Sequence, residues 1–200
     1  RSVLAIRPLL WENDWPVAGE AFTSGLYEIS SVRRGYALEL AVDFVRHDIP
    51  RSRWWEASDE PIASYPNQTL EEVKGTWPEG EIPARIGDWM NRPHQRWTVT
   101  AVPEAGGYLG GQYYKIQIEG TDRVLAAAKD AEVTTAPSFT GAAEQLWRIE
   151  QLTDGTFRIM PKEVPGTDRQ YVLTSIADST PTLAEYDFNS DNCKWKFIRK

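Results

Sequence analysis

The sequence predicts an all-β fold built from three similar units, and spacing, strand pattern and composition all point to it. Trp97, Trp147 and Trp195 follow one another at intervals of 50 and 48 residues, and each opens a short, largely apolar strand-like run. A fixed period of this length is a sign of internal repeats. Helical signals are few, and runs with the alternation of half-buried strands dominate between turn residues. We therefore expect three equivalent lobes around one axis.

Two further strands are found in each unit by working back from its tryptophan. An opener of the form aromatic–polar–aliphatic begins each unit, and a second apolar strand follows it. The openers start at Tyr27, Tyr114 and Phe157, and the second strands span residues 37–40, 124–127 and 171–174. The inward positions of these strands predict a core that contains Leu38, Trp97, Ile116, Leu125, Trp147, Ile159, Leu173, Trp195 and Phe197.

The first unit carries a long insertion. Its opener lies 87 residues before the second opener, whereas 43 residues separate the second from the third. The comparison places the insertion within residues 43–84, which include Trp54, Trp55 and Trp77 but show no sustained strand or helix period. Long irregular segments usually serve a function or are disordered, and disordered chains are poor in aromatic residues. We expect a loop that packs over the first unit.

Composition and missing motifs exclude several classes of function. A net charge of −7 argues against nucleic-acid or anionic-membrane partners, because both need a basic face. No apolar run approaches the length of a membrane span. His47, His94 and the one cysteine, Cys193, do not form a metal motif, so no metal or other cofactor is expected. The signatures H-E-x-x-H, G-x-S-x-G and G-x-x-x-x-G-K-[ST] are missing, and no catalytic residue is predicted. The glycine-rich segment 106–111 is interpreted as a hairpin turn.

The three units resemble the ricin-B-type β-trefoil over residues 24–200. The resemblance rests on the openers, the second strands and a Gln-x-Trp motif, which is complete at Gln95 and Gln145 and has Cys193 in place of the third glutamine. It implies a β-trefoil with a long loop insertion in the first repeat. The implied domain spans residues 23–200, with repeats at about 23–100, 101–150 and 151–200. The glutamines and tryptophans of the motif are expected to be structural.

In the family that the chain resembles, each unit can hold one shallow sugar pocket. Such a pocket uses an acid from the second strand, an aromatic residue from a later loop and a polar residue just before Gln-x-Trp. A carboxylate accepts strong hydrogen bonds from sugar hydroxyls, and an aromatic ring packs against the C–H face of the sugar. The second unit has Ala126 at the acid position, so its pocket is expected to be degenerate.

The first unit is the expected main site, because only this unit combines an acid, an aromatic residue and an amide. Glu39 would accept hydroxyls, Trp89 would be the stacking platform, and Asn91 and His94 would be polar contacts. The third unit has Thr174 at the acid position, so its pocket would need the carboxylate of Asp187 or Asp168 instead. The predicted carbohydrate-binding residues are Glu39, Asp88, Trp89, Asn91, His94, Tyr186, Asp187 and Asn192. Turn formation is the alternative for Asp88, Asn91 and Asp187, because turns favour aspartate and asparagine.

The segment before the repeats resembles the C-terminal end of a glycoside hydrolase family 43 catalytic domain of the arabinanase-like kind. The resemblance is carried by Arg7-Pro8-Leu9-Leu10-Trp11 and Trp15-Pro16-Val17. It implies that residues 1–22 are a tail or linker at the end of a β-propeller, whose catalytic carboxylates lie upstream. An ordinary strand packed on the trefoil is the alternative.

Together these resemblances predict a non-catalytic carbohydrate-binding module that targets a plant-polysaccharide hydrolase to arabinan or a related hemicellulose. The expected partners are a polysaccharide or oligosaccharide and the upstream catalytic domain. The expected localisation is secreted or extracellular, with a signal peptide upstream in the parent protein. Two alternatives stay open: a structural spacer with decayed pockets, and a rim domain of a family 43 glycosidase whose insertion reaches over the catalytic cleft.

Overall fold

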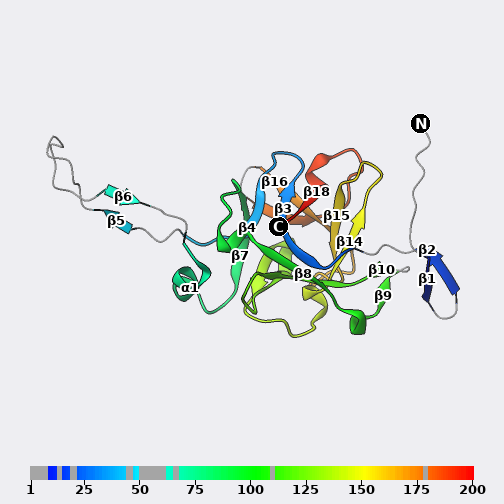
Figure 1. Ribbon diagram of the computed structural model, residues 1–200. Helices are drawn as coiled ribbons and strands as arrows, with labels where there is room; N and C mark the ends of the chain where they lie inside the picture. Colours follow the sequence, from blue (N-terminus) through cyan, green and yellow to red (C-terminus); the bar gives the residue numbers. More distant parts are fainter. Residues whose placement is uncertain are drawn as a thin grey trace.

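The centre of the protein is a closed barrel of six antiparallel strands (Figure 1). The computed structural model describes residues 9–12, 15–18, 22–43, 47–49, 62–64, 68–108, 111–177 and 180–200. Each unit contributes two barrel strands, its opener and the strand that begins at its tryptophan. In order around the barrel these are β3 (Gly25–Ser31), β8 (Trp97–Ala101), β11 (Tyr114–Ile118), β14 (Trp147–Gln151), β15 (Phe157–Pro161) and β18 (Trp195–Arg199). Pairing of β18 with β3 closes the ring.

Three hairpins, one from each unit, cap the barrel. They are β4 (Ala37–Leu40) with β7 (Ile82–Gly87), β12 (Val124–Ala127) with β13 (Val133–Ala136), and β16 (Val172–Ile176) with β17 (Thr180–Ala184). Short 3₁₀ turns precede the three tryptophan strands at η2 (Pro93–Gln95), η5 (Ala143–Gln145) and η6 (Asp191–Cys193), and two more lie at η3 (Pro103–Ala105) and η4 (Lys129–Ala131). This arrangement is a β-trefoil, which confirms the predicted fold.

The three tryptophans occupy equivalent positions in the core. Each indole Nε1–H donates a hydrogen bond to a leucine carbonyl in the second strand of its own unit: Trp97 to Leu38 at 2.8 Å, Trp147 to Leu125 at 2.9 Å and Trp195 to Leu173 at 2.7 Å. All three tryptophans are fully buried. A buried indole N–H needs a partner, so these bonds join each barrel strand to its cap hairpin. The threefold relation predicted from the spacing is confirmed.

The predicted core is confirmed except at one position. Eight of the nine predicted residues are 0% exposed, and the ninth, Phe197, is only partly buried. Phe197 lies at the barrel end, where its ring centroid is 4.6 Å from that of Phe22 and 5.3 Å from that of Phe157. Phe22 also exchanges hydrogen bonds with Tyr114, through its own N–H at 2.8 Å and its own carbonyl at 2.9 Å. An aromatic cluster thus closes this end of the barrel.

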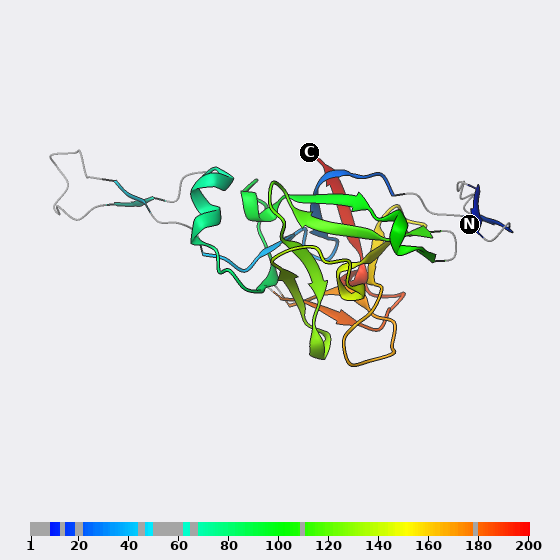
Figure 2. The ribbon, with the colours of Figure 1, turned by 90° about the horizontal axis from the view of Figure 1, so that it is seen from below.

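The insertion lies between β4 and β7, as the opener spacing predicts. It contains β5 (His47–Ile49), β6 (Ile62–Ser64), α1 (Leu70–Val73) and η1 (Lys74–Thr76). Figures 1 and 2 show the β5–β6 ribbon standing away from the barrel, whereas α1 lies beside it. Trp77 packs against the core, while Trp54 and Trp55 lie outside the described residues. The expected packing over the first unit therefore holds for the segment from α1 to Trp77 and not for the ribbon.

The segment before the barrel contains one hairpin. Strand β1 (Leu9–Glu12) pairs antiparallel with β2 (Trp15–Ala18), and this hairpin stands apart from the barrel in Figures 1 and 2. Leu4 and Ile6, which belong to the proposed propeller tail, lie outside the described residues.

The glycine-rich segment forms the expected hairpin, β9 (Gly107–Tyr108) with β10 (Gly111–Gln112). Within the described residues, no helix is long and apolar enough to cross a membrane.

Trp147→Phe tests the tryptophan–leucine bond. The variant keeps an aromatic ring but leaves the Leu125 carbonyl without its indole donor in a fully buried site, which costs about 1–3 kcal/mol of unfolding free energy. The midpoint of urea unfolding measures the loss. Trp89→Phe is the control, because Trp89 is partly exposed and should change the midpoint little. Equal midpoints for the two variants would contradict a structural role for the indole N–H.

Candidate carbohydrate-binding surfaces

The glutamine of each Gln-x-Trp motif organises the loop before it. Gln95 Nε2 donates to the Asp88 carbonyl at 2.7 Å, and Gln95 Oε1 accepts from the Met90 N–H at 2.8 Å. Gln145 makes the same pair of contacts, with the Ser138 carbonyl at 3.1 Å and the Thr140 N–H at 2.7 Å. Each amide therefore binds the backbone seven and five residues earlier, which bears out the expected structural role.

In the third unit, Cys193 cannot make these contacts, because a thiol lacks the paired donor and acceptor of an amide. The residues seven and five positions earlier are Tyr186 and Phe188. Their loop is closed instead by Asp187, whose Oδ1 accepts from the Asn189 N–H at 2.9 Å. The geometry of Asp187 is thus that of a turn residue, the alternative that the sequence left open.

Glu39 lies inside the protein and is only 4% exposed. Its Oε1 accepts from Arg85 Nε at 2.5 Å, and its Oε2 accepts from Gln95 Nε2 at 2.6 Å. His94 Nε2 is 3.5 Å from the same Oε2. A side chain at Gly87 would come within 3.0 Å of the carboxylate. The group expected as an open acceptor for sugar hydroxyls is therefore an internal link between β4, β7 and the loop before Trp97.

The charge of Glu39 follows from these contacts. Burial alone would raise the pKa of this carboxyl, because it disfavours the charged form. The close contact with His94 and the hydrogen bonds from Arg85 and Gln95 act in the opposite direction and together outweigh burial, so the pKa of Glu39 lies below its ordinary value. Glu39 is ionised at neutral pH, and its ionised form stabilises the fold.

The other predicted residues of the first unit do not join Glu39 around an open pocket. Asp88 and Asn91 are exposed, and Asn91 Oδ1 accepts from Arg96 Nε at 3.1 Å. Trp89 is partly exposed, and the Lys200 ammonium lies 4.4 Å from the centre of its ring. His94 is 4% exposed. Sugar binding by Glu39 and by these four residues stays a prediction.

A small recess beside His94 shows why the first unit has little room. Its volume is about 10 Å³, which holds roughly one water molecule. Val73 and Trp77 of the insertion line it together with His94 and Pro93. The end of the insertion thus leaves little space beside His94, one of the predicted polar contacts.

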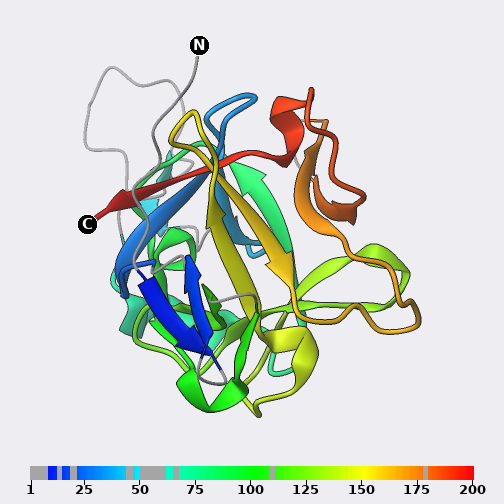
Figure 3. The ribbon, with the colours of Figure 1, turned by 90° about the vertical axis from the view of Figure 1, so that its right-hand side faces the viewer.

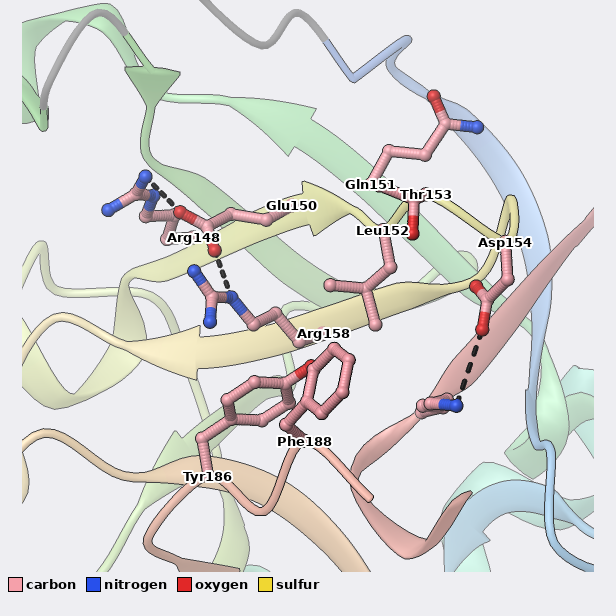
Figure 4. A pocket seen from close by; sticks show the side chains of 10 residues that line it. Arg148, Glu150, Gln151, Leu152, Thr153, Asp154, Arg158, Tyr186 and Phe188 are labelled. Carbon is pink, nitrogen blue, oxygen red and sulfur yellow. Dashed lines mark hydrogen bonds and ion pairs between the residues drawn. The ribbon is translucent and has the colours of Figure 1, made fainter. Parts of the chain in front are cut away.

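A larger cleft lies between units two and three. It has a volume of about 540 Å³, within the usual range for small-ligand sites. Figure 3 shows β14 and β15 side by side, and the turn between them forms one wall. Tyr186 and Phe188 of the β17–β18 loop form the other, with Leu152 pointing toward them in Figure 4. Phe188 is 75% exposed.

Charged side chains border both ends of this cleft. At one end Glu150, which is 3% exposed, is paired with Arg148 and Arg158. At the other end Asp154 Oδ2 is 3.3 Å from Lys194 Nζ. Figure 4 shows the two groups on either side of the aromatic rings. The Arg158 guanidinium carbon also lies 4.8 Å from the centre of the Tyr186 ring.

Of the predicted residues, only Tyr186 lines the cleft. Asn192 is partly buried, and its backbone N–H donates to Ser190 Oγ at 3.2 Å. Thr174, at the expected acid position, is buried against Cys193 with an Oγ1–Sγ distance of 3.6 Å. Sequence reasoning missed Phe188, although the loss of glutamine at position 193 marks the loop that carries it. Among the described residues, no group of His, Cys, Asp and Glu is arranged to hold a metal ion.

Comparison with known proteins supports the fold. The model of the ricin-type beta-trefoil lectin domain-like family matches residues 93–167. No curated protein sequence matches the chain. The similar solved structures described next are only 14–16% identical to this chain, so their similarity shows the fold alone.

Three similar structures show the range of proteins that contain this fold. The designed threefold-symmetric protein ThreeFoil is 16% identical with a TM-score of 0.57, over 88% of this chain and 99% of that one. A Polyporus squamosus lectin, solved with a sialylated epitope, is 16% identical with a TM-score of 0.55, over 90% of this chain and 50% of that one. A mosquitocidal holotoxin is 14% identical with a TM-score of 0.59; 90% of this chain matches, but only 18% of the holotoxin.

Glu39→Gln tests the internal role of this carboxylate. At neutral pH the variant removes the charge that Arg85 faces and is expected to cost about 1–3 kcal/mol of unfolding free energy. Because the pKa of Glu39 is lowered in the folded state, its stabilisation is complete above the unfolded-state pKa and is lost as pH falls through the folded one. The difference between wild type and variant should therefore shrink toward acid pH in urea unfolding.

Glu119→Gln is the matched control, because Glu119 pairs with Arg96 at 3.4 Å on the surface, with a side chain that is 40% exposed. Removing such a pair changes stability by about 0–1 kcal/mol. If Glu39→Gln were as mild as this control, Glu39 would be available for a ligand after all.

Proposed function

We propose that the chain is a non-catalytic carbohydrate-binding module. The observation that carries the proposal is the aromatic cleft between units two and three, bordered by charged groups at both ends, on a lectin-like β-trefoil. The family match over residues 93–167 supports it. Two structures of the same fold were solved with saccharides: the Polyporus squamosus lectin, and a β-trefoil lectin of a Vibrio vulnificus cytolysin with N-acetyl-D-lactosamine. The particular saccharides are ligands of those proteins. For this chain they support only the proposal that the ligand is a saccharide.

The cleft has the chemical parts that sugar recognition needs. A sugar ring presents C–H groups on its face and hydroxyls around its edge. The C–H face packs on an aromatic ring such as Phe188, which buries apolar area at little entropic cost. Hydroxyls bind charged donors and acceptors through the stronger class of hydrogen bonds. A site this open recovers roughly 4–6 kcal/mol, so affinity per site should lie between about millimolar and tens of micromolar.

We propose further that the module belongs to a secreted plant-polysaccharide hydrolase and keeps its catalytic domain near arabinan or a related hemicellulose. The resemblance of residues 1–22 to the end of a family 43 catalytic domain supports this, with the trefoil beginning near residue 23. The position of Phe22, which packs into the aromatic end of the barrel, gives that linker a fixed point of attachment. In this arrangement the polymer is bound by the trefoil and cleaved by the upstream domain.

A second candidate is a structural or rim domain without sugar affinity of its own. The internal pairing of Glu39 supports it, as do the missing acids at Ala126 and Thr174. In this role, the insertion between β4 and β7 would complete the edge of the catalytic cleft in the parent enzyme.

Titration of the chain against arabinan, xylan and galactan tests the proposed function. Isothermal calorimetry or affinity electrophoresis should detect weak binding to at least one polymer, with dextran as the control polymer. The parent enzyme without residues 43–81 provides the contrasting measurement. Absence of binding together with altered turnover of that deletion variant would favour the rim role. Absence of both effects would leave the spacer.

A further inference from the structure

We infer that the cleft binds a neutral saccharide at the junction of units two and three, outside the pocket expected within each unit. This inference rests on the proposed function and specifies its site and ligand class. The expected pocket of unit three would use the second strand, Tyr186 and Asn192, but only Tyr186 is shared with the cleft. The floor of the cleft comes from barrel strands β14 and β15.

Comparison of the three junctions shows what is special about this one. Glu150 and Arg158 are cross-strand partners where β14 meets β15. The corresponding partners are Thr100 and Lys115 where β8 meets β11, and Ile198 and Glu28 where β18 meets β3. An ion pair of opposite charges therefore occupies this position at only one of the three junctions.

The aromatic residues of the loops differ in the same way. Trp89 and Phe139 stand six positions before Gln95 and Gln145, and each has a lysine ammonium over its ring, at 4.4 Å and 5.2 Å. In unit three the residue six positions before Cys193 is Asp187, and the aromatic residues Tyr186 and Phe188 stand on either side of it. Arg158 packs on Tyr186, whereas no cation lies over Phe188 within the described part of the chain. The 75% exposed ring of Phe188 is therefore open to a ligand.

The replacement of glutamine by Cys193 connects these features. In units one and two the glutamine binds the backbone at the positions that correspond to Tyr186 and Phe188. In unit three the turn at Asp187 closes the loop instead, with the Ser190 N–H donating to the Asp187 carbonyl at 3.1 Å. The two aromatic side chains then face β14 and β15 across the cleft, as Figure 4 shows.

Charge balance determines the ligand class. The group formed by Arg148, Arg158 and Glu150 carries one net positive charge. Lys194 faces two carboxylates, Asp154 at 3.3 Å and Asp191 at 2.8 Å, so that group carries one net negative charge. The charged residues that line the cleft thus sum to one positive charge, and Asp191, which lies beside Lys194 outside the lining, offsets it. The cleft and its border are therefore close to neutral, in a chain with a net charge of −7. A neutral ligand suits such a site. An acidic sugar would be repelled by the Asp154 carboxylate and by the net negative charge of the chain.

Both ends of the cleft can bind hydroxyl groups. The Arg158 guanidinium has five N–H donors, and its pair with Glu150 uses Nε. Asp154 accepts from the Thr156 N–H through Oδ1 at 2.9 Å, and among the described residues its Oδ2 contacts only Lys194, at the longer distance of 3.3 Å. The pKa of Asp154 is lowered by its hydrogen bonds from Thr156, which outweigh burial, so this carboxylate is an ionised acceptor at neutral pH. A ring stacked on Phe188 would have donors on one side and acceptors on the other.

The test uses oligosaccharides of arabinan, xylan and galactan as neutral probes and oligogalacturonate as the acidic probe, titrated into the full chain. Phe188→Ala should weaken binding of the neutral probe by about tenfold, the effect of losing one aromatic contact. Asp154→Asn keeps the side-chain volume and should weaken it about three- to tenfold through loss of a charged acceptor. Phe188 is exposed, so its variant should keep the urea midpoint of the wild type. Asp154→Asn keeps an oxygen that can accept from the Thr156 N–H, so its midpoint should fall only slightly.

Met90→Ala is the matched control, because Met90 stands five residues before Gln95, as Phe188 does before Cys193, and is 46% exposed. It should leave affinity unchanged. If the wild type binds neutral sugars, and this binding is lost in Trp89→Ala but kept in Phe188→Ala, the site is not the cleft. The proposed function would then still stand. Preference for oligogalacturonate would overturn the ligand class. A wild-type chain that binds none of the probes would remove the proposed function and this inference together.

Discussion

The hydrogen bond from a buried tryptophan to a leucine carbonyl, made three times, is the interaction on which the rest of the structure depends. It joins a barrel strand to its cap hairpin in every unit, with N–O distances between 2.7 and 2.9 Å. The sequence separation of the two partners is 22 residues in units two and three and 59 in unit one. The contact is preserved across this difference, which shows that the insertion leaves the barrel unchanged and extends only one hairpin.

The loops before the tryptophans are where the units diverge, because the core constrains them less. Gln95 and Gln145 bind their loops in the same way, which holds those loops close to the cap. Cys193 packs in the core as a small apolar side chain, but it does not bind the loop backbone as the glutamines do, and the loop is closed by the turn at Asp187 instead. Unit three therefore presents two aromatic side chains to the neighbouring barrel strands. A departure from the repeat, and not the repeat itself, is the basis of the candidate site.

This division explains how much could be predicted from the sequence. The fold was accessible because Trp97, Trp147 and Trp195 and the strand openers recur with a period, and the inward positions of alternating strands identified the core. Phe197 was the exception, since it lies at the barrel end, where Phe22 shares its environment. The site was less accessible. Glu39 has the right residue type at the right position, but the sequence does not show that Arg85 and Gln95 would converge on it.

Phe188 and Glu150 show another reason why the site could not be predicted from the sequence. They are 38 residues apart and belong to different units, so no motif within one unit contains both. Their proximity arises because the barrel places the end of unit two beside the last loop of unit three. In unit one, by contrast, Glu39 is paired with Arg85 of its own unit, and the insertion leaves little space beside His94. The same threefold frame thus gives a buried ion pair at Glu39 in one place and an open cleft with the exposed ring of Phe188 in another.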